Sequence, residues 1–428
     1  MRFNRALAAP LAAAASVLMA LTGCSGSGQS ESSDSDVHLR MVMWTSNPAQ
    51  LAAFRSIADE FMQQNHSVTK IDFQSITLDQ LNTVLTTQIQ AGDPPDLSWL
   101  PVESSRQYIK AGALADAAPV LKSTDGYDYD DLTPSLASRW KVGDALYGVP
   151  FSTGPLVMYY NKDLYAKAGV KSPADLIAEN NWTWESFRQS SKQLTDKLSI
   201  PGYVLNDFDF KNWTRLLPLL YSYGASAWND DATKCTADSP EFLKAISLFH
   251  DMVFTDKSSP VPGQQADFWG GQAGATTAFL GSSSLLKDAK FKFGMVPTPT
   301  GPAGDTQALG QSSIVTLAAS KHKQAALQFL AFLTNKQNSA KLAQFYPPIR
   351  GSLLNPKTLV GTSTILTEDL VAPIVAAAKS TGKIFPSATD ATGVADALNS
   401  SLDKYVYVPN ADLPDALKKV CAAVSPHL

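Results

Sequence analysis

Apolar and polar residues follow a regular pattern through the first seventy positions of the main body of the chain. Short apolar runs recur there, and each is followed by a stretch in which apolar residues return every three or four positions, the spacing of a helix with one buried face. The pattern predicts strands at residues 39–44, 70–74 and 96–100, and helices at residues 50–65, 79–91 and 104–111. Strand and helix alternate three times, which indicates an α/β protein with a parallel sheet.

The remainder of the chain is richer in helices. Residues 146–150 and 156–160 predict two short strands, because Pro150 and Gly154 interrupt the apolar run between them. Later strands are predicted at residues 292–296 and 313–317. Helices are predicted at residues 183–194, 216–223 and 321–333, another begins at Pro240 after the capping residue Ser239, and three more follow by residue 423.

The extreme N-terminus has the pattern of an export signal. Residues 1–5 carry two arginines and no acid, and residues 6–21 are uncharged and rich in alanine and leucine. The segment ends in Leu-Thr-Gly-Cys at residues 21–24, which resembles the bacterial lipobox. This resemblance implies a signal peptide of residues 1–23 and a lipid on the thiol of Cys24. The alternatives are an ordinary secretory signal with a chance cysteine and, less favoured because no charged flank follows, a signal anchor.

The residues after Cys24 predict a tether. Residues 25–36 contain no apolar side chain, so we expect residues 24–36 to be disordered and to reach roughly 20 Å. Removal of residues 1–23 takes away two arginines and no acid, which changes the formal net charge from −4 to −6. The expected arrangement is a folded body held close to the outer face of a membrane by the anchor at Cys24.

Composition narrows the class of protein. The chain has 428 residues, of which 44% are hydrophobic and 17% charged, so it can bury a sizeable core and suggests two or three domains. Its mild acidity argues against a nucleic-acid partner. Five histidines and three cysteines leave little material for a metal site, and no second apolar stretch is long enough to span a bilayer. We therefore expect no cofactor and no polytopic membrane protein.

Two cysteines remain once Cys24 carries a lipid. Thiols outside the cell tend to pair, so we expect a disulfide between Cys235 and Cys421. The alternative is two separate buried cysteines, because sequence alone does not bring distant positions into contact.

Several short segments resemble, in order, those of a known family. They are AGDPPDL at residues 91–97, YIKAGAL at 108–114, YGVP at 147–150, YYNKDL at 159–164, TWESF at 183–187, FGMVP at 293–297, AALQFLAFLT at 325–334 and PIR at 348–350. The ordered set is similar to the extracellular solute-binding proteins of ABC importers, in the carbohydrate-binding branch with maltodextrin and glycerophosphodiester receptors. The resemblance covers most of residues 39–350, and the final 75 residues match only as generic helices.

This resemblance implies a two-lobed periplasmic-binding-protein-like α/β fold of type II, with an interlobe ligand cleft and a hinge. One lobe would comprise residues 37–149 and 310–350, and the other residues 150–309 and 351–428. Cys235 and Cys421 would then lie in the same lobe, which strengthens the expected disulfide.

The candidate ligand contacts follow from the chemistry of a sugar. A neutral sugar offers hydroxyls and flat C–H faces, so its site needs carboxylates and amides for hydrogen bonds and aromatic rings for stacking. Ligands of open α/β sheets sit at strand ends and in the loops after them. Together with the resemblance, these rules give Trp44, Thr45, Ser46, Glu103, Phe151, Ser152, Thr153, Asp207, Trp213, Gly281, Ser282, Gly310, Gln311, Ser312, Tyr346 and Arg350.

Several of these residues have a structural alternative. Trp44 and Trp213 also suit the core, and Glu103 suits the first turn of a helix, where the helix dipole favours an acid. Arg350 suits either a phosphate or carboxylate group of a ligand or a structural ion pair. The family often has an aromatic residue near the turn at Gly281, and none follows the glycine here, which argues against a stacking platform at that point.

The motifs favour a receptor over an exported carbohydrate-active hydrolase. No Gly-x-Ser-x-Gly elbow, His-Glu-x-x-His pair or Ser-x-x-Lys block occurs in a matching context. Two acids brought together by the fold would still suit glycoside cleavage, and turnover distinguishes the two classes.

The resemblance implies a mechanism and partners. The hinge would close around one ligand, and the closed form would dock on the membrane permease subunits of an ABC importer. We expect a lipid-anchored monomer on the extracytoplasmic side of the cell membrane. Mono-, di- and oligosaccharides, amino sugars and glycerophosphodiesters all remain open as ligands. The turn at Gly281 and Arg350 favour a small or charged ligand, whereas the acidity of the chain opposes a strongly anionic one.

Overall fold

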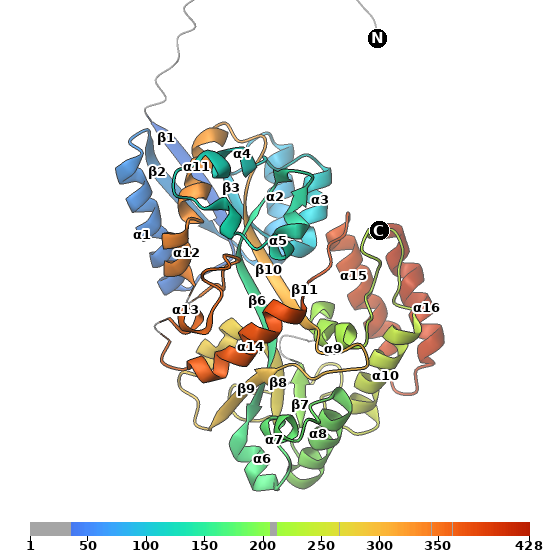
Figure 1. Cartoon of the computed structure of the whole chain (residues 1–428). Helices are drawn as coiled ribbons and strands as arrows, with labels where there is room; N and C mark the ends of the chain where they lie inside the picture. The colour runs from blue at the N-terminus through green and yellow to red at the C-terminus, as the bar shows by residue number, and fades with distance from the viewer. Residues whose placement is uncertain (1–35, 206–211, 265, 344, 362) are drawn as a thin grey trace, which may run out of the picture.

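Residues 37–101 form the parallel strand–helix units that the hydrophobic pattern predicts. In the computed structural model, which describes residues 36–205, 212–264, 266–343, 345–361 and 363–428, β1 (Val37–Met43) pairs in parallel with β2 (Val68–Ser75) and with β3 (Leu97–Pro101) (Figure 1). Between these strands, α1 (Pro48–Gln64) buries Phe54, Ile57, Ala58 and Phe61 against the sheet. The predicted parallel α/β arrangement is therefore confirmed.

Nine of the described strands form one mixed sheet that runs through two lobes, and the other two pair with each other in a separate small sheet. The order of the large sheet is β2-β1-β3-β10-β6-β8-β7, with β11 beside β10 and β9 beside β6. The remaining strands are β4 (Lys141–Val142), β5 (Ala145–Leu146), β6 (Val149–Asn161), β7 (Tyr203–Leu205), β8 (Ala275–Phe279), β9 (Phe293–Pro297), β10 (Gln307–Thr316) and β11 (Gly382–Ile384). The strands β2, β1 and β3 lie in one lobe, hereafter lobe 1, and β7, β8 and β9 lie in the other, lobe 2 (Figure 1).

Two long strands connect the lobes. The 13 residues of β6 span roughly 40 Å, so its first half pairs with β10 and its second half with β8 and β9. Likewise, β10 pairs with β3 through residues 312–316 and with β11 through residues 307–309. The boundaries expected at residues 149–150 and 309–310 both fall inside these two strands.

The prediction of two short strands at residues 146–150 and 156–160 was wrong, because one continuous strand runs through both breakers. Pro150 is accommodated next to an irregularity of the ladder, where Ser312 pairs with Ser152 and Ser313 with Pro150. A bulge is one of the few places where a strand tolerates proline. Gly154 pairs with Gly310 of β10, which begins six residues earlier than predicted.

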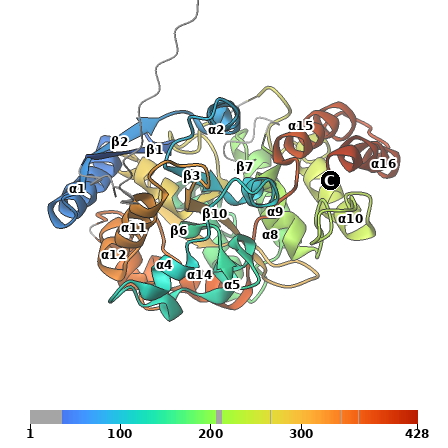
Figure 2. The ribbon, with the colours of Figure 1, turned by 90° about the horizontal axis from the view of Figure 1, so that it is seen from above.

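Helices cover both lobes. They are α2 (Leu81–Gln90), α3 (Ser105–Lys110), α4 (Ala118–Ser123), α5 (Pro134–Ala137), α6 (Lys162–Ala168), α7 (Pro173–Ala178), α8 (Trp184–Leu198), α9 (Leu217–Ser222), α10 (Pro240–Phe254), α11 (Lys323–Leu333), α12 (Lys336–Leu342), α13 (Pro356–Val360), α14 (Glu368–Thr381), α15 (Ala391–Ser401) and α16 (Leu413–Val424). Seen from above, α1, α11 and α12 lie at one end of the molecule and α10, α15 and α16 at the other (Figure 2). Within the described residues no helix combines the length and apolarity needed to cross a bilayer.

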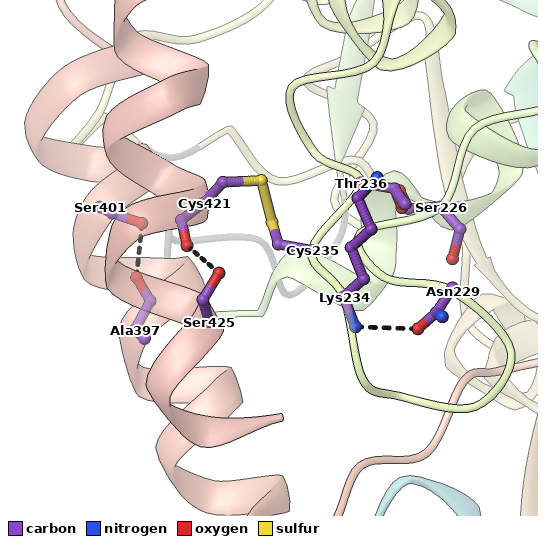
Figure 3. The surroundings of a disulfide bond; sticks show 9 residues. All are labelled: Ser226, Asn229, Lys234, Cys235, Thr236, Ala397, Ser401, Cys421 and Ser425. Carbon is purple, nitrogen blue, oxygen red and sulfur yellow. Dashed lines mark hydrogen bonds between the residues drawn. A yellow bond between two sulfur atoms is a disulfide. The ribbon is translucent and has the colours of Figure 1, made fainter.

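The C-terminal tail packs mainly on lobe 2. Five helices follow α11 in the described part of the chain, where the pattern predicted three. The strand β11 joins the tail to β10, and α16 packs on α10 and α15. A disulfide between Cys235 and Cys421 ties α16 to the loop that precedes α10 (Figure 3). The expected disulfide is thus present, between residues 186 positions apart.

The disulfide should contribute strongly to stability, because it closes a loop of 186 residues. Replacing both partners, Cys235→Ser with Cys421→Ser, should lower the free energy of unfolding by on the order of 3–5 kcal/mol. Urea unfolding of the protein with its disulfide formed measures the loss. A reductant should lower the wild-type midpoint and leave the double variant unchanged, and equal midpoints for the two proteins without reductant would contradict the prediction.

Candidate functional site

The site is organised by the crossing of β6 and β10. In this ladder Ser152 lies opposite Ser312, and Ser312 also lies opposite Pro101 at the end of β3. Both serine side chains are partly exposed, whereas their neighbours Thr153 and Gln311 are buried. Successive residues of a strand point to opposite faces, so the two serines, both predicted from sequence, share one accessible face.

The opposite face of the crossing is a closed polar network. The Gln311 side chain accepts a hydrogen bond from Trp140 Nε1 at 2.8 Å and donates to the Leu136 carbonyl at 2.7 Å and to Thr153 Oγ1 at 3.1 Å. Every polar atom of this amide therefore has a protein partner. Of the predicted contacts, Gln311 and Thr153 therefore have their side chains in the interior.

Phe279, at the end of β8, covers the crossing from lobe 2. A Cβ atom built on Gly310 would lie 2.5 Å from the Phe279 ring, and one on Gly154 would lie 3.5 Å from it. The paired glycines therefore leave the space in which this half-exposed ring sits. Phe279 was missed in the sequence because the aromatic was sought after Gly281, whereas it stands two residues before that glycine. Gly310 contributes to this region because it has no side chain, which leaves room for the Phe279 ring.

Arg215 and Glu103 approach the same place from different lobes. The guanidinium of Arg215, in the 3₁₀ turn η5 (Trp213–Leu216), lies 4.6 Å from the Phe279 ring centroid. Glu103 lies in the turn η2 (Val102–Ser104), two residues after the Pro101 that faces Ser312. Burial raises the pKa of the Glu103 carboxyl to about 7, while its own backbone N–H and the charge of Arg215 favour the ionised form. Glu103 is therefore a partly exposed acid whose carboxyl is poorly solvated and lies near a cation.

An aromatic group flanks the crossing in lobe 1. Ring centroids lie 5.1 Å apart between Trp44 and Trp99, 4.8 Å between Trp99 and Phe151, and 5.0 Å between Phe151 and Tyr346. These are edge-to-face and tilted contacts of a packed cluster. Trp44 and Tyr346 are partly exposed, whereas Trp99 and Phe151 are buried. The structure thus brings three predicted residues together and adds Trp99, whose position inside β3 marked it only as a core residue.

The other predicted residues are spread around this region. Thr45 is buried and its hydroxyl bonds Gln50 at the start of α1, while Ser46 is exposed. Gly281 is exposed and Ser282 partly exposed in the turn η6 (Leu280–Leu286), which directly follows Phe279.

Trp213 packs in the core, which was the structural alternative to ligand contact for this residue. Its side chain is buried and packs on Trp228 with ring centroids 5.1 Å apart. Both its exposure and its packing are those of a core residue.

Arg350 is a structural residue of lobe 1. Only 1% of its side chain is exposed. Its guanidinium donates to the carbonyls of Tyr127, Asp128 and Thr334 at 2.8–3.1 Å and lies 3.5 Å from Asp131. This environment matches the structural alternative given for Arg350, because protein acceptors engage its donors.

Two predicted positions, Cys24 and Asp207, lie outside the described residues. In the described ranges, no three His, Cys, Asp or Glu side chains gather closely enough to hold a metal ion.

Comparison of the sequence with known proteins identifies a protein family. Residues 45–340 match the sequence profile of the bacterial extracellular solute-binding proteins. The chain is 26% identical to an uncharacterized lipoprotein of Streptomyces antibioticus, over 77% of this chain and 73% of that protein. It is 22% identical to an arabinooligosaccharide-binding protein of Bacillus subtilis, over 76% of this chain and 75% of the relative.

A solved structure shares the fold. An ABC substrate-binding protein from Listeria monocytogenes, in complex with cycloalternan, superposes with a TM-score of 0.77 over 91% of this chain and 98% of that one. The sequences are 24% identical, so this likeness establishes the two-lobed architecture.

Gly310 should tolerate no side chain, unlike its partner Gly154. Gly310→Ala places a Cβ 2.5 Å from the Phe279 ring, whereas Gly154→Ala meets the ring at an ordinary 3.5 Å. We expect the Gly310 variant to lose about 1–3 kcal/mol of unfolding free energy through overpacking, and the Gly154 variant to lose clearly less. Urea unfolding compares them. Adding Phe279→Ala should restore part of the loss, and equal losses for the two alanine variants would contradict this explanation.

The carboxyl of Glu103 should make stability depend on pH. Its pKa is about 7 in the folded protein against an ordinary 4.5, so between these values the native state holds a proton that the unfolded state has lost. The unfolding free energy should therefore fall as the pH rises through this window, by on the order of 2–3 kcal/mol. Urea unfolding at pH 4.5, 6 and 7.5 measures the slope.

Glu103→Gln should flatten this slope, because the amide does not titrate. The control is Glu60→Gln, which removes an exposed carboxylate paired with Lys341 on the surface of lobe 1 and should keep the wild-type slope. A Glu103→Gln protein with the wild-type slope would show that another group causes it.

Proposed function

The chain belongs to the family of bacterial extracellular solute-binding proteins, and from this premise we propose that it captures a carbohydrate between its two lobes for an ABC importer. The observation that carries the proposal is the meeting of groups from both lobes at the crossing of β6 and β10. Glu103 and Ser312 come from lobe 1. Ser152, Arg215 and Phe279 come from lobe 2. A ligand held there would contact both lobes.

The chemistry of this region suits sugar hydroxyls. A carboxyl with a pKa of about 7 can accept or donate a hydrogen bond near neutral pH, and the two serines add hydroxyls of either sense. Trp44, Phe151 and Tyr346 would supply apolar contact for C–H faces. Ser46, Gly281 and Ser282 remain further proposed contacts at its margins. Relatives support this choice, because one is an arabinooligosaccharide-binding protein and a protein of the same fold was solved with cycloalternan.

We propose that the ligand closes a hinge at β6 and β10. These strands alone carry the sheet from one lobe to the other, so changes in their backbone angles would rotate one lobe against the other. The lobes would comprise residues 37–149 with 310–350, and residues 150–309 with 351–428. A ligand that binds the closed form more tightly shifts the population towards it.

The N-terminal segment would hold this receptor at the membrane. We propose cleavage after residue 23, a lipid on Cys24 and a tether of residues 24–36. The extracellular family and a lipoprotein among the relatives support this location. The receptor would act as a monomer, without a cofactor, and pass its sugar to the permease subunits.

A carbohydrate panel tests the proposal. At a hundredfold excess over Kd, a bound sugar should add about 2.7 kcal/mol to the stability, so the melting temperature should rise in a dose-dependent way. The panel contains neutral mono-, di- and oligosaccharides, amino sugars and glycerophosphodiesters. Chromatography of the released ligand should return it unchanged.

Glu103→Gln should weaken binding of the identified sugar by about tenfold, the effect of losing one hydrogen bond to a charged group. Glu60→Gln on the outer surface of lobe 1 should bind like the wild type. No thermal shift with any member of the panel would refute the carbohydrate proposal, and detected hydrolysis products would indicate an enzyme.

A further inference from the structure

A segment of the C-terminal tail lies beside Glu103. Residues 384–392, here called the strap, lead from the end of β11 into α15 and lie beyond the residues matched by the family profile. The first five residues of the strap are buried. Phe385 packs on Phe279, with ring centroids 6.2 Å apart, so the strap contacts the same ring that covers the crossing of β6 and β10.

One end of the strap is fixed to lobe 2. The Phe385 backbone N–H donates to the carbonyl of Leu309, and the Tyr221 hydroxyl donates to the carbonyl of Ile384 at 3.1 Å. Trp228 Nε1 donates to the carbonyl of Ser387 at 3.3 Å. Trp228 belongs to the loop that ends at Cys235, which the disulfide attaches to α16 (Figure 3). The strap therefore starts from a rigid base.

The other end of the strap contacts lobe 1, at three points around Glu103. The Ala388 backbone N–H donates to the carbonyl of Glu103 at 3.3 Å. Lys110, at the end of α3, donates to Thr389 Oγ1 at 3.0 Å, and Asn82 donates to Thr392 Oγ1 at 3.1 Å.

These contacts all act on one short piece of chain. Asn82 also lies within hydrogen-bond distance of Ser104 and of the Tyr108 hydroxyl. The strap and Asn82 thus hold the turn η2 and the helix α3 from one side, and this turn carries Glu103. Nothing in the strap sequence indicates such a contact, because its partners lie about 280 residues earlier.

We propose that the strap is a specificity-determining wall of the ligand site, which positions the turn bearing Glu103 and keeps water from the carboxyl of that residue. The part that concerns ligand affinity rests on the proposed function. The part that concerns Glu103 does not, because it is measured on the protein alone.

One charged group, Arg215 of η5, acts on Glu103, and the charges of Arg139, Glu103 and Asp230 all act on the Tyr221 hydroxyl of α9. Arg106 of α3 donates to the carbonyl of Asp230 at 2.9 Å, and Arg139 forms an ion pair with the Asp230 carboxylate at 3.6 Å. Lys383 lies over the Tyr221 ring. The variants for the test leave all of these groups in place.

The test loosens one contact at each end of the strap. Trp228→Phe removes an indole donor but keeps a ring, and Thr389→Ala removes the acceptor for Lys110. The matched control combines Trp182→Phe, which removes an indole donor to the Pro297 carbonyl elsewhere in lobe 2, with Thr87→Ala on the exposed side of α2. Glu103 is followed by ¹³C NMR of glutamate-labelled protein, its signal being assigned as the one lost in Glu103→Gln.

We expect the titration midpoint of Glu103 to fall by about one pH unit in the Trp228→Phe, Thr389→Ala protein, because water reaches the carboxyl. The control should keep the wild-type midpoint. Any panel sugar that binds the wild type should bind the strap variant about 2- to 10-fold more weakly, the range for one lost hydrogen bond. If the double variant does not fold, Thr389→Ala alone should shift the midpoint in the same direction.

An unchanged Glu103 midpoint in the folded strap variant overturns the proposal, whether or not a sugar binds. A lowered midpoint in a protein that binds no member of the panel supports the positioning of Glu103 by the strap and refutes the carbohydrate function instead.

Discussion

The antiparallel pairing of β6 with β10 is the interaction on which the rest of the molecule depends. It joins the two halves of a sheet whose other strands each stay within one lobe. Because side chains alternate across a strand, this ladder has one face with Ser152 and Ser312 accessible and another with Thr153 and Gln311 locked in a buried network. A one-residue change of register would exchange these faces, so the pairing determines which polar groups are accessible.

The same pairing explains why small residues stand at the crossing. Gly154 and Gly310 lie opposite each other, and the ring of Phe279 occupies the space above them. That ring in turn lies against the guanidinium of Arg215. Lobe 2 therefore presents a cation held by an aromatic face, opposite a carboxyl of lobe 1 whose pKa burial has raised. Desolvation outweighs the attraction to Arg215 here, so near pH 7 the Glu103 carboxyl exchanges between its neutral and ionised forms beside a permanent positive charge.

Three of the predicted ligand contacts are buried, for one shared reason. Arg350, Gln311 and Trp213 are residue types that bind ligands well, because each combines a large surface with directional donors or a ring. The same properties let them complete an interior: Arg350 joins three backbone carbonyls of lobe 1, and Gln311 joins Trp140 to Leu136. Whether such a residue serves a ligand or the fold depends on which side of its strand or turn it occupies, and the residue type does not reveal that.

Local pattern alone determined the parallel units of residues 37–101, the caps at Thr183 and Ser239, and the family, because periodicity and ordered motifs depend on neighbours in sequence. Their positions relative to the predicted strands also identified Glu103, Ser152 and Ser312 as candidate ligand contacts. Only the tertiary structure decided that Pro150 and Gly154 lie inside one strand, that Phe279 and Arg215 meet at the crossing, and that the strap reaches Glu103. These outcomes rest on contacts between positions tens to hundreds of residues apart, which depend on packing and burial and leave no periodic trace in the sequence.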